Sequence, residues 1–290
     1  MKLLLDDVVA TLDEASRLKV TEDLQVIHAD NVAEFFYLGD EKADWAYREF
    51  PNLAPPFDHF WIEYPLPEQL NVNGRLHPSG LAGLGRIGFE WRAIDAASFR
   101  QQYRSEYGLD TVVQAPHARW ILAANVFIRQ ATVGLLIAVD GEGRGIHAAS
   151  GDNLLLIVPP GLEPWATALS QHFVTIVGPV FLTLSLMHCR NVERVPKIAS
   201  PKRSRGAYRN QSRFTYHTLN IAPMRQVLET EGQSETLGMQ RALHICRGHF
   251  ATYADRPLFG KYRGTFWVPM HVRGVVEAGR TAKDYSVKAQ

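Results

Sequence analysis

Apolar and polar positions in the first part of the chain follow the period of a helix. A broad apolar face predicts an amphipathic helix over residues 3–18. A second helical stretch covers residues 31–37, where Asn31 is the N-cap candidate and Glu34, three residues later, fits a variant of the capping box. The chain therefore opens with helical structure.

Runs rich in β-branched and aromatic residues predict strands through the middle of the chain. Proline-rich and glycine-rich segments, such as residues 51–58 and 140–145, separate these runs. The predicted strands cover residues 59–64, 86–92, 119–128, 131–139, 154–158 and 214–221.

One long stretch, from Trp165 to Cys189, contains no Asp, Glu, Lys or Arg. Its densest apolar part, residues 173–187, is shorter than the roughly 20 residues that a spanning helix needs. Polar residues dilute it, and Gly178-Pro179 interrupts it. We expect a buried core helix here rather than a membrane span.

These elements predict an α+β protein with a mixed or largely antiparallel sheet, a long buried helix and a β-rich C-terminal segment. Residues 1–197 form the predicted α+β body, and residues 198–213 form a basic linker or arm. Residues 214–290 form the C-terminal segment, which is either appended to the body or completes its sheet.

Composition and charge limit the classes of function. The chain is 46% hydrophobic and 21% charged, which is ordinary for a globular protein with a core. Its 31 basic and 30 acidic residues leave a formal net charge of +1, so any electrostatic attraction of nucleic acid must be local. Two distant cysteines favour a reducing cytoplasm and exclude a zinc site made only of cysteine. Asp6 and Asp7 end the N-terminal leucine run too early for a secretory signal.

The segment from Arg241 to Lys288 concentrates side chains that could carry chemistry. The catalytic candidates are His249, His271, Arg247 and Arg273. His244 and His249 are weak metal-ligand candidates, because a spacing of five places them about 140° apart on a helix and on opposite faces of a strand. No cofactor is evident from the sequence.

A strand predicted over residues 262–272 would divide its side chains between two faces. One face is apolar, with Tyr262, Phe266, Val268, Met270 and Val272, and the other carries Arg263, Thr265, Trp267, His271 and Arg273. The second face suits anions, bases or a polar partner, and Lys261 lies beside it. The alternative is that the rings pack and the arginines pair with nearby carboxylates.

Three neighbouring features complete this prediction. Pro269 predicts an edge strand or a bulge, because proline donates no hydrogen bond to a ladder. Residues 283–288 are expected to close the sheet after a turn over residues 274–280. The arm before the segment could contact phosphates or simply be a solvated loop; its candidate cations are Lys202, Arg203, Arg205, Arg209 and Arg213.

Several of these blocks resemble an uncharacterised family of bacteriophage and prophage proteins. The resemblance extends over about residues 185–288, with a weaker echo at residues 59–63. It is carried by Arg190-Asn-Val192, the basic arm, Tyr216-His-Thr-Leu219, and the terminal block from His244 through Arg-Gly-His249-Phe, Leu-Phe-Gly260, Gly-Thr-Phe-Trp267 and His271-Val-Arg-Gly274 to Lys-Asp-Tyr285. It implies a phage origin and the cytoplasm of the host cell, and it supplies no catalytic residue.

The sequence therefore favours a phage-type accessory protein that binds nucleic acid, or a host protein that processes nucleic acid, through the arm and the segment around residues 244–273. The first alternative is a phosphodiester hydrolase or nuclease, with or without a metal. In it, His249 or His271 is the general base, and Arg247, Arg273 or Lys261 stabilises developing charge. The second alternative is a virion or assembly component. The oligomeric state stays open.

Overall fold

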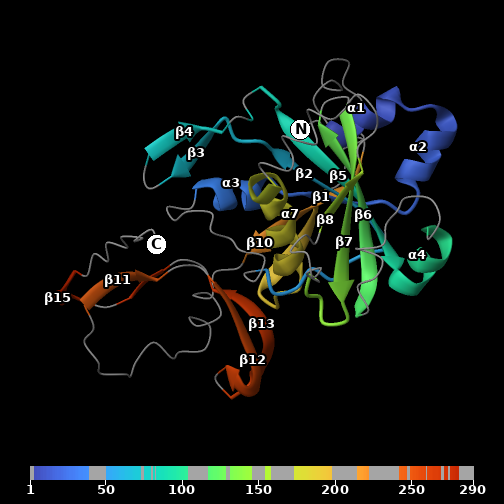
Figure 1. Cartoon of the computed structure of the whole chain (residues 1–290). Coiled ribbons are helices and arrows are strands. Elements are labelled where there is room, and N and C mark those ends of the chain that lie inside the picture. Colours follow the sequence, from blue (N-terminus) through green and yellow to red (C-terminus); the bar gives the residue numbers. More distant parts are fainter. Residues whose placement is uncertain are drawn as a thin grey trace, which may run out of the picture. The chain divides into compact units, whose positions relative to one another are not determined.

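The structure is a computed structural model of an α+β protein, as the sequence predicts (Figure 1). It describes residues 3–38, 50–72, 75–79, 81, 83–103, 117–128, 131–145, 154–157, 173–197, 214–221, 242–246, 249–258, 260–268, 271–273 and 275–280. The chain divides into two compact units, one of residues 1–188 and 194–220 and the other of residues 189–193 and 221–290.

A mixed sheet of eight described strands forms the first unit. Its strand order is β8-β7-β6-β5-β2-β1-β10-β9. The run from β8 to β2 is antiparallel, whereas β1 is parallel to both β2 and β10. The strands are β1 (Gln25–His28), β2 (His59–Pro65), β5 (Arg86–Asp95), β6 (Ala118–Ile128), β7 (Ala131–Asp140), β8 (Leu154–Ile157), β9 (Val192–Lys197) and β10 (Tyr216–Ile221). A separate hairpin pairs β3 (Gln69–Val72) with β4 (Arg75–Pro78).

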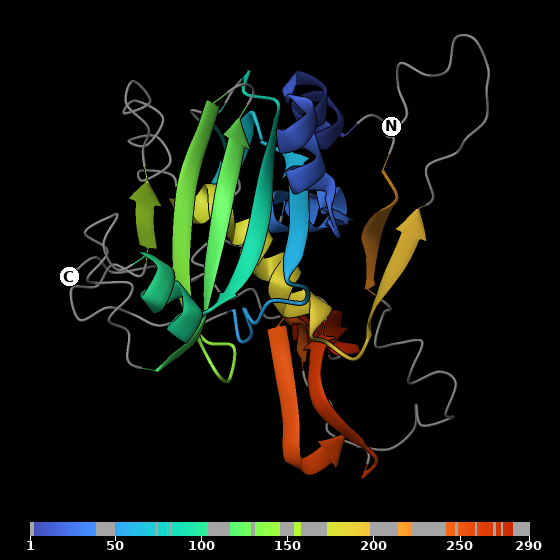
Figure 2. The same cartoon turned by 90° about the vertical axis from the view of Figure 1, so that its right-hand side faces the viewer.

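Helices cover both faces of this sheet (Figures 1 and 2). On one face, α1 packs around Trp61 and Val26, and α4 packs Phe99 against Ile121 and Leu136. On the other face, the Tyr64 hydroxyl donates to a backbone carbonyl of α7. The first face holds α1 (Leu4–Thr11), α2 (Glu14–Thr21) and α4 (Ala96–Tyr103), and the second holds α3 (Asp30–Leu38) and α7 (Phe173–Met187).

The helix α7 contains a proline, Pro179, and a side chain from α3 compensates for it. Proline has no N–H, so the Thr175 carbonyl four residues earlier loses its helical donor. The Tyr37 hydroxyl donates to this carbonyl at 2.8 Å. The next residue toward the N-terminus is Gly178, and a Cβ there would lie 2.3 Å from the Phe36 ring. The Gly-Pro pair thus lets α3 and α7 approach closely.

We predict that Tyr37→Phe lowers the free energy of unfolding by about 1–3 kcal/mol, the cost of leaving a partly buried carbonyl without a donor. Urea denaturation at pH 7 measures the loss. In the background of Pro179→Ala, which restores the helical donor to the Thr175 carbonyl, the same change should cost much less. Tyr216→Phe is the control, and an equal loss there would contradict this role for the Tyr37 hydroxyl.

The structure revises several predicted boundaries near the N-terminus. The helix predicted over residues 3–18 is two helices, because the Asp13 carboxylate accepts a hydrogen bond from the Ser16 N–H at 2.8 Å and starts α2. The helix α3 begins at Asp30, so Asn31 is not its cap; the Asn31 side chain instead donates to the Leu219 carbonyl of β10. Among the described helices, none combines the length and apolar character that a membrane crossing requires.

The second unit contains two small sheets. A hairpin pairs β12 (His249–Leu258) with β13 (Tyr262–Val268), and β11 (Ala242–Cys246) pairs with β14 (His271–Arg273) and β15 (Val275–Arg280). The single strand predicted over residues 262–272 is therefore wrong, because β13 and β14 belong to different sheets. The turn predicted over residues 274–280 is also wrong, because β15 occupies most of it.

Two further points concern the predicted C-terminal segment and the arm before it. Strand β10, which the sequence assigned to the C-terminal segment, joins the sheet of the first unit beside β1. The arm over residues 198–213 and the closing strand over residues 283–288 lie outside the described residues.

Candidate functional site

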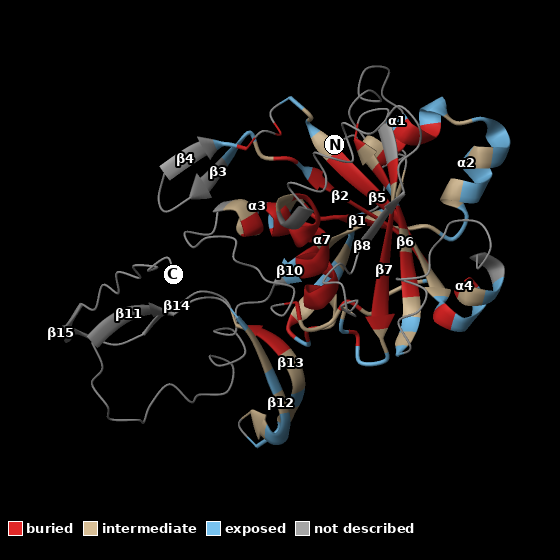
Figure 3. Cartoon of the chain, in the orientation of Figure 1, coloured by how far each residue is buried: buried red, intermediate tan, exposed pale blue. Residues whose placement is uncertain are grey.

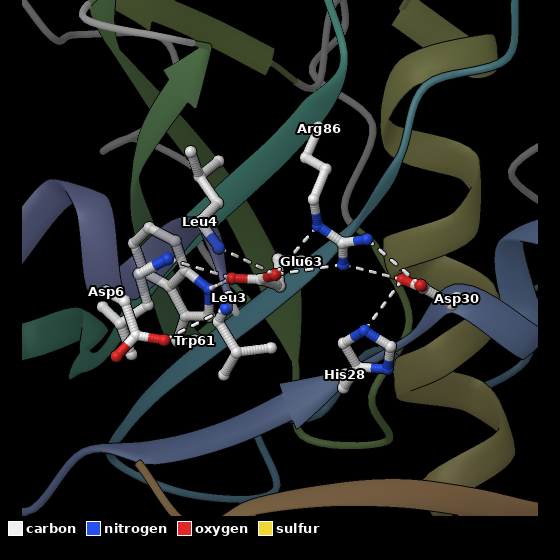
Figure 4. Close-up of polar contacts among 9 residues, drawn as sticks. Leu3, Leu4, Asp6, His28, Asp30, Trp61, Glu63 and Arg86 are labelled. Carbon is white, nitrogen blue, oxygen red and sulfur yellow. Dashed lines mark hydrogen bonds and ion pairs between the residues drawn. The ribbon is translucent and has the colours of Figure 1, made fainter. Parts of the chain in front are cut away.

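A buried carboxylate, Glu63, organises the charged groups at the carboxyl ends of β1 and β2 (Figure 4). Its side chain is 0% exposed. One oxygen accepts from the Leu4 N–H at 3.0 Å and the other from the Leu5 N–H at 3.1 Å. These are N–H groups of the first turn of α1, which have no partner within the helix. Glu63 therefore binds the N-terminus of α1 to the middle of the sheet.

Two side chains donate to the remaining lone pairs of Glu63. The Trp61 indole N–H lies 2.9 Å from Oε2, and the Arg86 Nε lies 3.0 Å from Oε1. Trp61 comes from the same strand and Arg86 from the start of β5. A buried ion is tolerated only when its hydrogen-bonding groups are satisfied, and Glu63 meets this condition.

The guanidinium of Arg86 continues the network to a second helix N-terminus. Its two terminal nitrogens bond to the Asp30 carboxylate at 3.1 and 2.7 Å, a bidentate pair. Asp30 is the first residue of α3, where a negative charge is stabilised by the helix dipole. Burial alone raises the pKa of the Asp30 carboxyl, but His28 and Arg86 more than offset this effect and hold the pKa below its usual value.

The open side of the network is formed by His28, Asp30 and Arg86. The His28 ring is buried against Tyr216, with ring centroids 5.4 Å apart. Its Nε2 lies 3.1 Å from Asp30 Oδ1 but is not aligned for a hydrogen bond. Asp30 and Arg86 keep 32% and 24% of their side-chain surface. The arrangement can orient the His28 imidazole beside the Asp30 carboxylate. The Arg86 guanidinium is already paired with two carboxylates, those of Asp30 and Glu63.

The sequence did not identify this network. Its directly bonded members are separated by up to 59 positions, and its charged groups meet only because β1 runs parallel to β2 while β2 pairs antiparallel with β5. One signal was present, since Glu63 is the single carboxylate in a strand made mostly of apolar residues. A carboxylate in a strand buried on both faces requires donors from elsewhere in the chain.

The second unit carries a different candidate, an exposed basic surface on the β12–β13 hairpin. We call it the hairpin surface and define it by four exposed cations: Arg190, Arg256, Lys261 and Arg263. The exposed carboxylates of Glu193 and Asp255 lie in the same segments. The rings of Tyr253 and Tyr262 are half-buried there, and Lys261 Nζ lies 5.1 Å from the centre of the Tyr262 ring.

The segment before β9 is fixed to this hairpin by one backbone hydrogen bond and two bonds of the Asn191 side chain. The Arg190 N–H donates to the Thr265 carbonyl at 3.0 Å. The Asn191 side chain accepts from the Trp267 N–H at 2.9 Å and donates to the Trp267 carbonyl at 2.7 Å. Arg190 therefore lies beside β13 although 73 positions separate it from Arg263 in the sequence.

Of the predicted binding residues in this segment, Lys261 and Arg263 are exposed on the hairpin. The prediction that Trp267 lies on an open polar face is wrong. Its side chain is 1% exposed and packs edge-on against Phe250, with centroids 4.7 Å apart. Both Phe266 and Trp267 are buried, so the two faces of β13 do not divide into an apolar and a polar one.

The structure does not bring the predicted catalytic histidines together on one strand pair. His249 is exposed on β12 opposite Val268, whereas His271 pairs in register with Cys246. His244 stands opposite Arg273 on β11 and β14, in a different sheet from His249. Outside the described residues lie Arg247, Lys202, Arg203, Arg205, Arg209 and Arg213.

No group of three or more His, Cys, Asp or Glu side chains within the described ranges is placed to hold a metal ion. No protein-family model, curated protein or solved structure matches the chain.

Proposed function

We propose that this protein binds nucleic acid through the hairpin surface of its second unit. The observation that carries the proposal is the gathering of Arg190, Arg256, Lys261 and Arg263, all exposed, in a protein whose formal net charge is only +1. Cations that neutralise phosphates release counterions, and this release supplies most of the affinity of non-specific binding.

The arginines of this surface are available for an anionic ligand. Within the described residues, no carboxylate pairs with Arg190, Arg256 or Arg263. An unpaired guanidinium offers a fork of N–H donors that matches phosphate oxygens. This contrasts with Arg86 in the first unit, which two carboxylates occupy.

A glycine positions one of these arginines. Gly264 has φ +117°, a conformation that favours glycine, and the Arg190 side chain lies across it. A Cβ at Gly264 would meet Arg190 Nε at 2.8 Å and Cδ at 3.2 Å. Because Gly264 has no side chain, Arg190 can lie against the hairpin that carries Arg263.

The test is a salt titration of binding to single-stranded and duplex oligonucleotides. We expect log K to fall linearly with log salt concentration, and the double variant Arg190→Ala/Arg263→Ala to reduce the slope by about 1.5 to 2. The matched control is Arg119→Ala/Arg144→Ala, which removes the same charge from exposed positions of the first unit and should leave the slope unchanged.

Two results would overturn the proposal. Absence of binding to every oligonucleotide at about 20 mM salt would remove nucleic acid as the ligand, since electrostatic binding is strongest there. Equal slopes for the two double variants would show that nucleic acid does not bind at the hairpin surface. The first result would favour a host protein or an assembly partner. The suggested phage origin stays a prediction.

A further inference from the structure

A second buried histidine, His59, connects α2 to the sheet of the first unit. It is the first residue of β2 and is 8% exposed. Its Nδ1 lies 2.9 Å from the backbone carbonyl oxygen of Glu22, at the C-terminal end of α2. Its Nε2 lies 3.1 Å from Oε1 of Glu90 on β5. We call this pair of contacts the His59 bridge.

Both ring nitrogens of His59 thus face acceptors. A carbonyl oxygen only accepts, and an ionised carboxylate only accepts. A neutral imidazole carries a single N–H, so it can satisfy one of the two contacts and must turn a lone pair toward the other. Both contacts are hydrogen bonds only when the ring is an imidazolium.

The Glu90 carboxylate is held in its ionised form. Burial raises the pKa of Glu90, but hydrogen bonds from His59 and Asn125 and the charge of Arg92 outweigh it, so the pKa is below its ordinary value. Asn125 Nδ2 donates to Oε2 at 3.0 Å, and Arg92 lies 3.3 Å from Oε1. When His59 loses one proton, the remaining proton stays on the nitrogen that faces this carboxylate, the stronger acceptor. The Glu22 carbonyl then loses its donor.

Arg17 ties α2 to the preceding helix by donating to the Val9 and Leu12 carbonyls at 3.2 Å, but the C-terminal turn of α2 has few contacts. No residue of α2 is buried, which Figure 3 shows by its lack of red. Its C-terminal carbonyls are bound by His59 and by Arg92, whose terminal nitrogen donates to the Lys19 carbonyl at 2.9 Å. The charged side chains of this turn, Lys19, Glu22 and Asp23, are exposed to solvent. Only Val20 and Leu24 pack partly against the core cluster around α1.

We propose that the His59 bridge is a pH-dependent attachment of α2, in which deprotonation of His59 releases the C-terminal turn of α2 from the sheet. The attached form has a doubly protonated ring that donates to Glu22 and Glu90. The released form has a single N–H, directed to Glu90.

Hydrogen exchange in the full-length protein tests this attachment. Protection factors for α2 amides, corrected for the pH dependence of intrinsic exchange, are measured from pH 5 to 9 beside an NMR titration of the His59 ring. We expect protection in α2 to fall by about tenfold along the His59 titration, the effect of losing one charge-assisted hydrogen bond. Protection in β6 should not follow it.

Two substitutions separate the two contacts of the bridge. The side-chain amide of His59→Asn stands near the position of Nδ1 and can donate to Glu22 without titrating, so α2 should be protected at every pH. The amide of His59→Gln stands near the position of Nε2, so α2 should be released at every pH. His188→Gln is the control, because His188 binds a single carbonyl, that of Ala54, at the end of α7; this variant should keep the pH response of α2.

The inference is overturned if α2 protection stays constant while the His59 ring titrates. It is also overturned if His59→Asn responds to pH as the natural protein does. Arg92→Gln supplies a further check, since it should lower α2 protection at all pH values yet preserve the step at the His59 titration.

Discussion

Replacing Glu63 by alanine is expected to destabilise the first unit by about 3–5 kcal/mol, the usual cost of removing one partner of a buried ion pair. The change leaves two N–H groups of α1, the Trp61 indole N–H and one edge of the Arg86 guanidinium without their acceptor. Arg86 keeps only Asp30 as a counterion. Urea denaturation at pH 7, followed by tryptophan fluorescence, measures the loss.

Two comparisons isolate the role of the Glu63 charge. Glu63→Gln keeps the shape but replaces one acceptor oxygen by a donor, so it should lose stability by an intermediate amount. Glu34→Ala removes an exposed carboxylate from α3 and should change the stability by less than about 0.5 kcal/mol. A loss below about 1 kcal/mol for Glu63→Ala would show that the network does not anchor α1.

The strands that the sequence predicted well are those with long, continuous patterns. Predictions over residues 86–92, 119–128 and 131–139 are confirmed by β5, β6 and β7, although β5 continues to Asp95. Strand β1 was missed because four residues, Gln25–His28, are too short for a pattern to emerge from their neighbours. Yet β1 is the strand that makes the sheet mixed.

The candidate sites were harder to predict because each depends on pairing between distant segments. Lys261 and Arg263 were found in the sequence, since they are close together beside aromatic residues. Arg190 was not, because only its backbone bond to Thr265 brings it to the hairpin. Trp267 was misassigned for a related reason: the partners that bury it, Phe250 and Asn191, come from other segments. A polar pattern on one strand does not show what covers that strand.

Adding a side chain at Gly88 on β5 is expected to destabilise the protein about as strongly as removing the side chain of Glu63. A Cβ at Gly88 would lie 2.2 Å from Cζ2 and 2.8 Å from Cη2 of Trp61 on the neighbouring strand. The indole does not move aside easily, because its N–H is bonded to Glu63 and its ring packs against Phe127. We therefore expect Gly88→Ala to cost about 3 kcal/mol, the upper end of what overpacking a core costs.

A double-mutant cycle tests the cause of this loss. Trp61→Phe removes the six-membered ring of the indole, which contains both clashing atoms, and creates space at the cost of the bond to Glu63. If the clash is the cause, Gly88→Ala should cost at least about 1.5 kcal/mol less in the Trp61→Phe background than alone, a coupling typical of residues in contact. Gly141→Ala is the matched control, because the nearest atom to its Cβ, Arg119 Cδ, is 3.9 Å away. Additive losses of stability at Gly88 and Trp61 would contradict the clash. They would mean that glycine is needed at position 88 for the backbone conformation of β5.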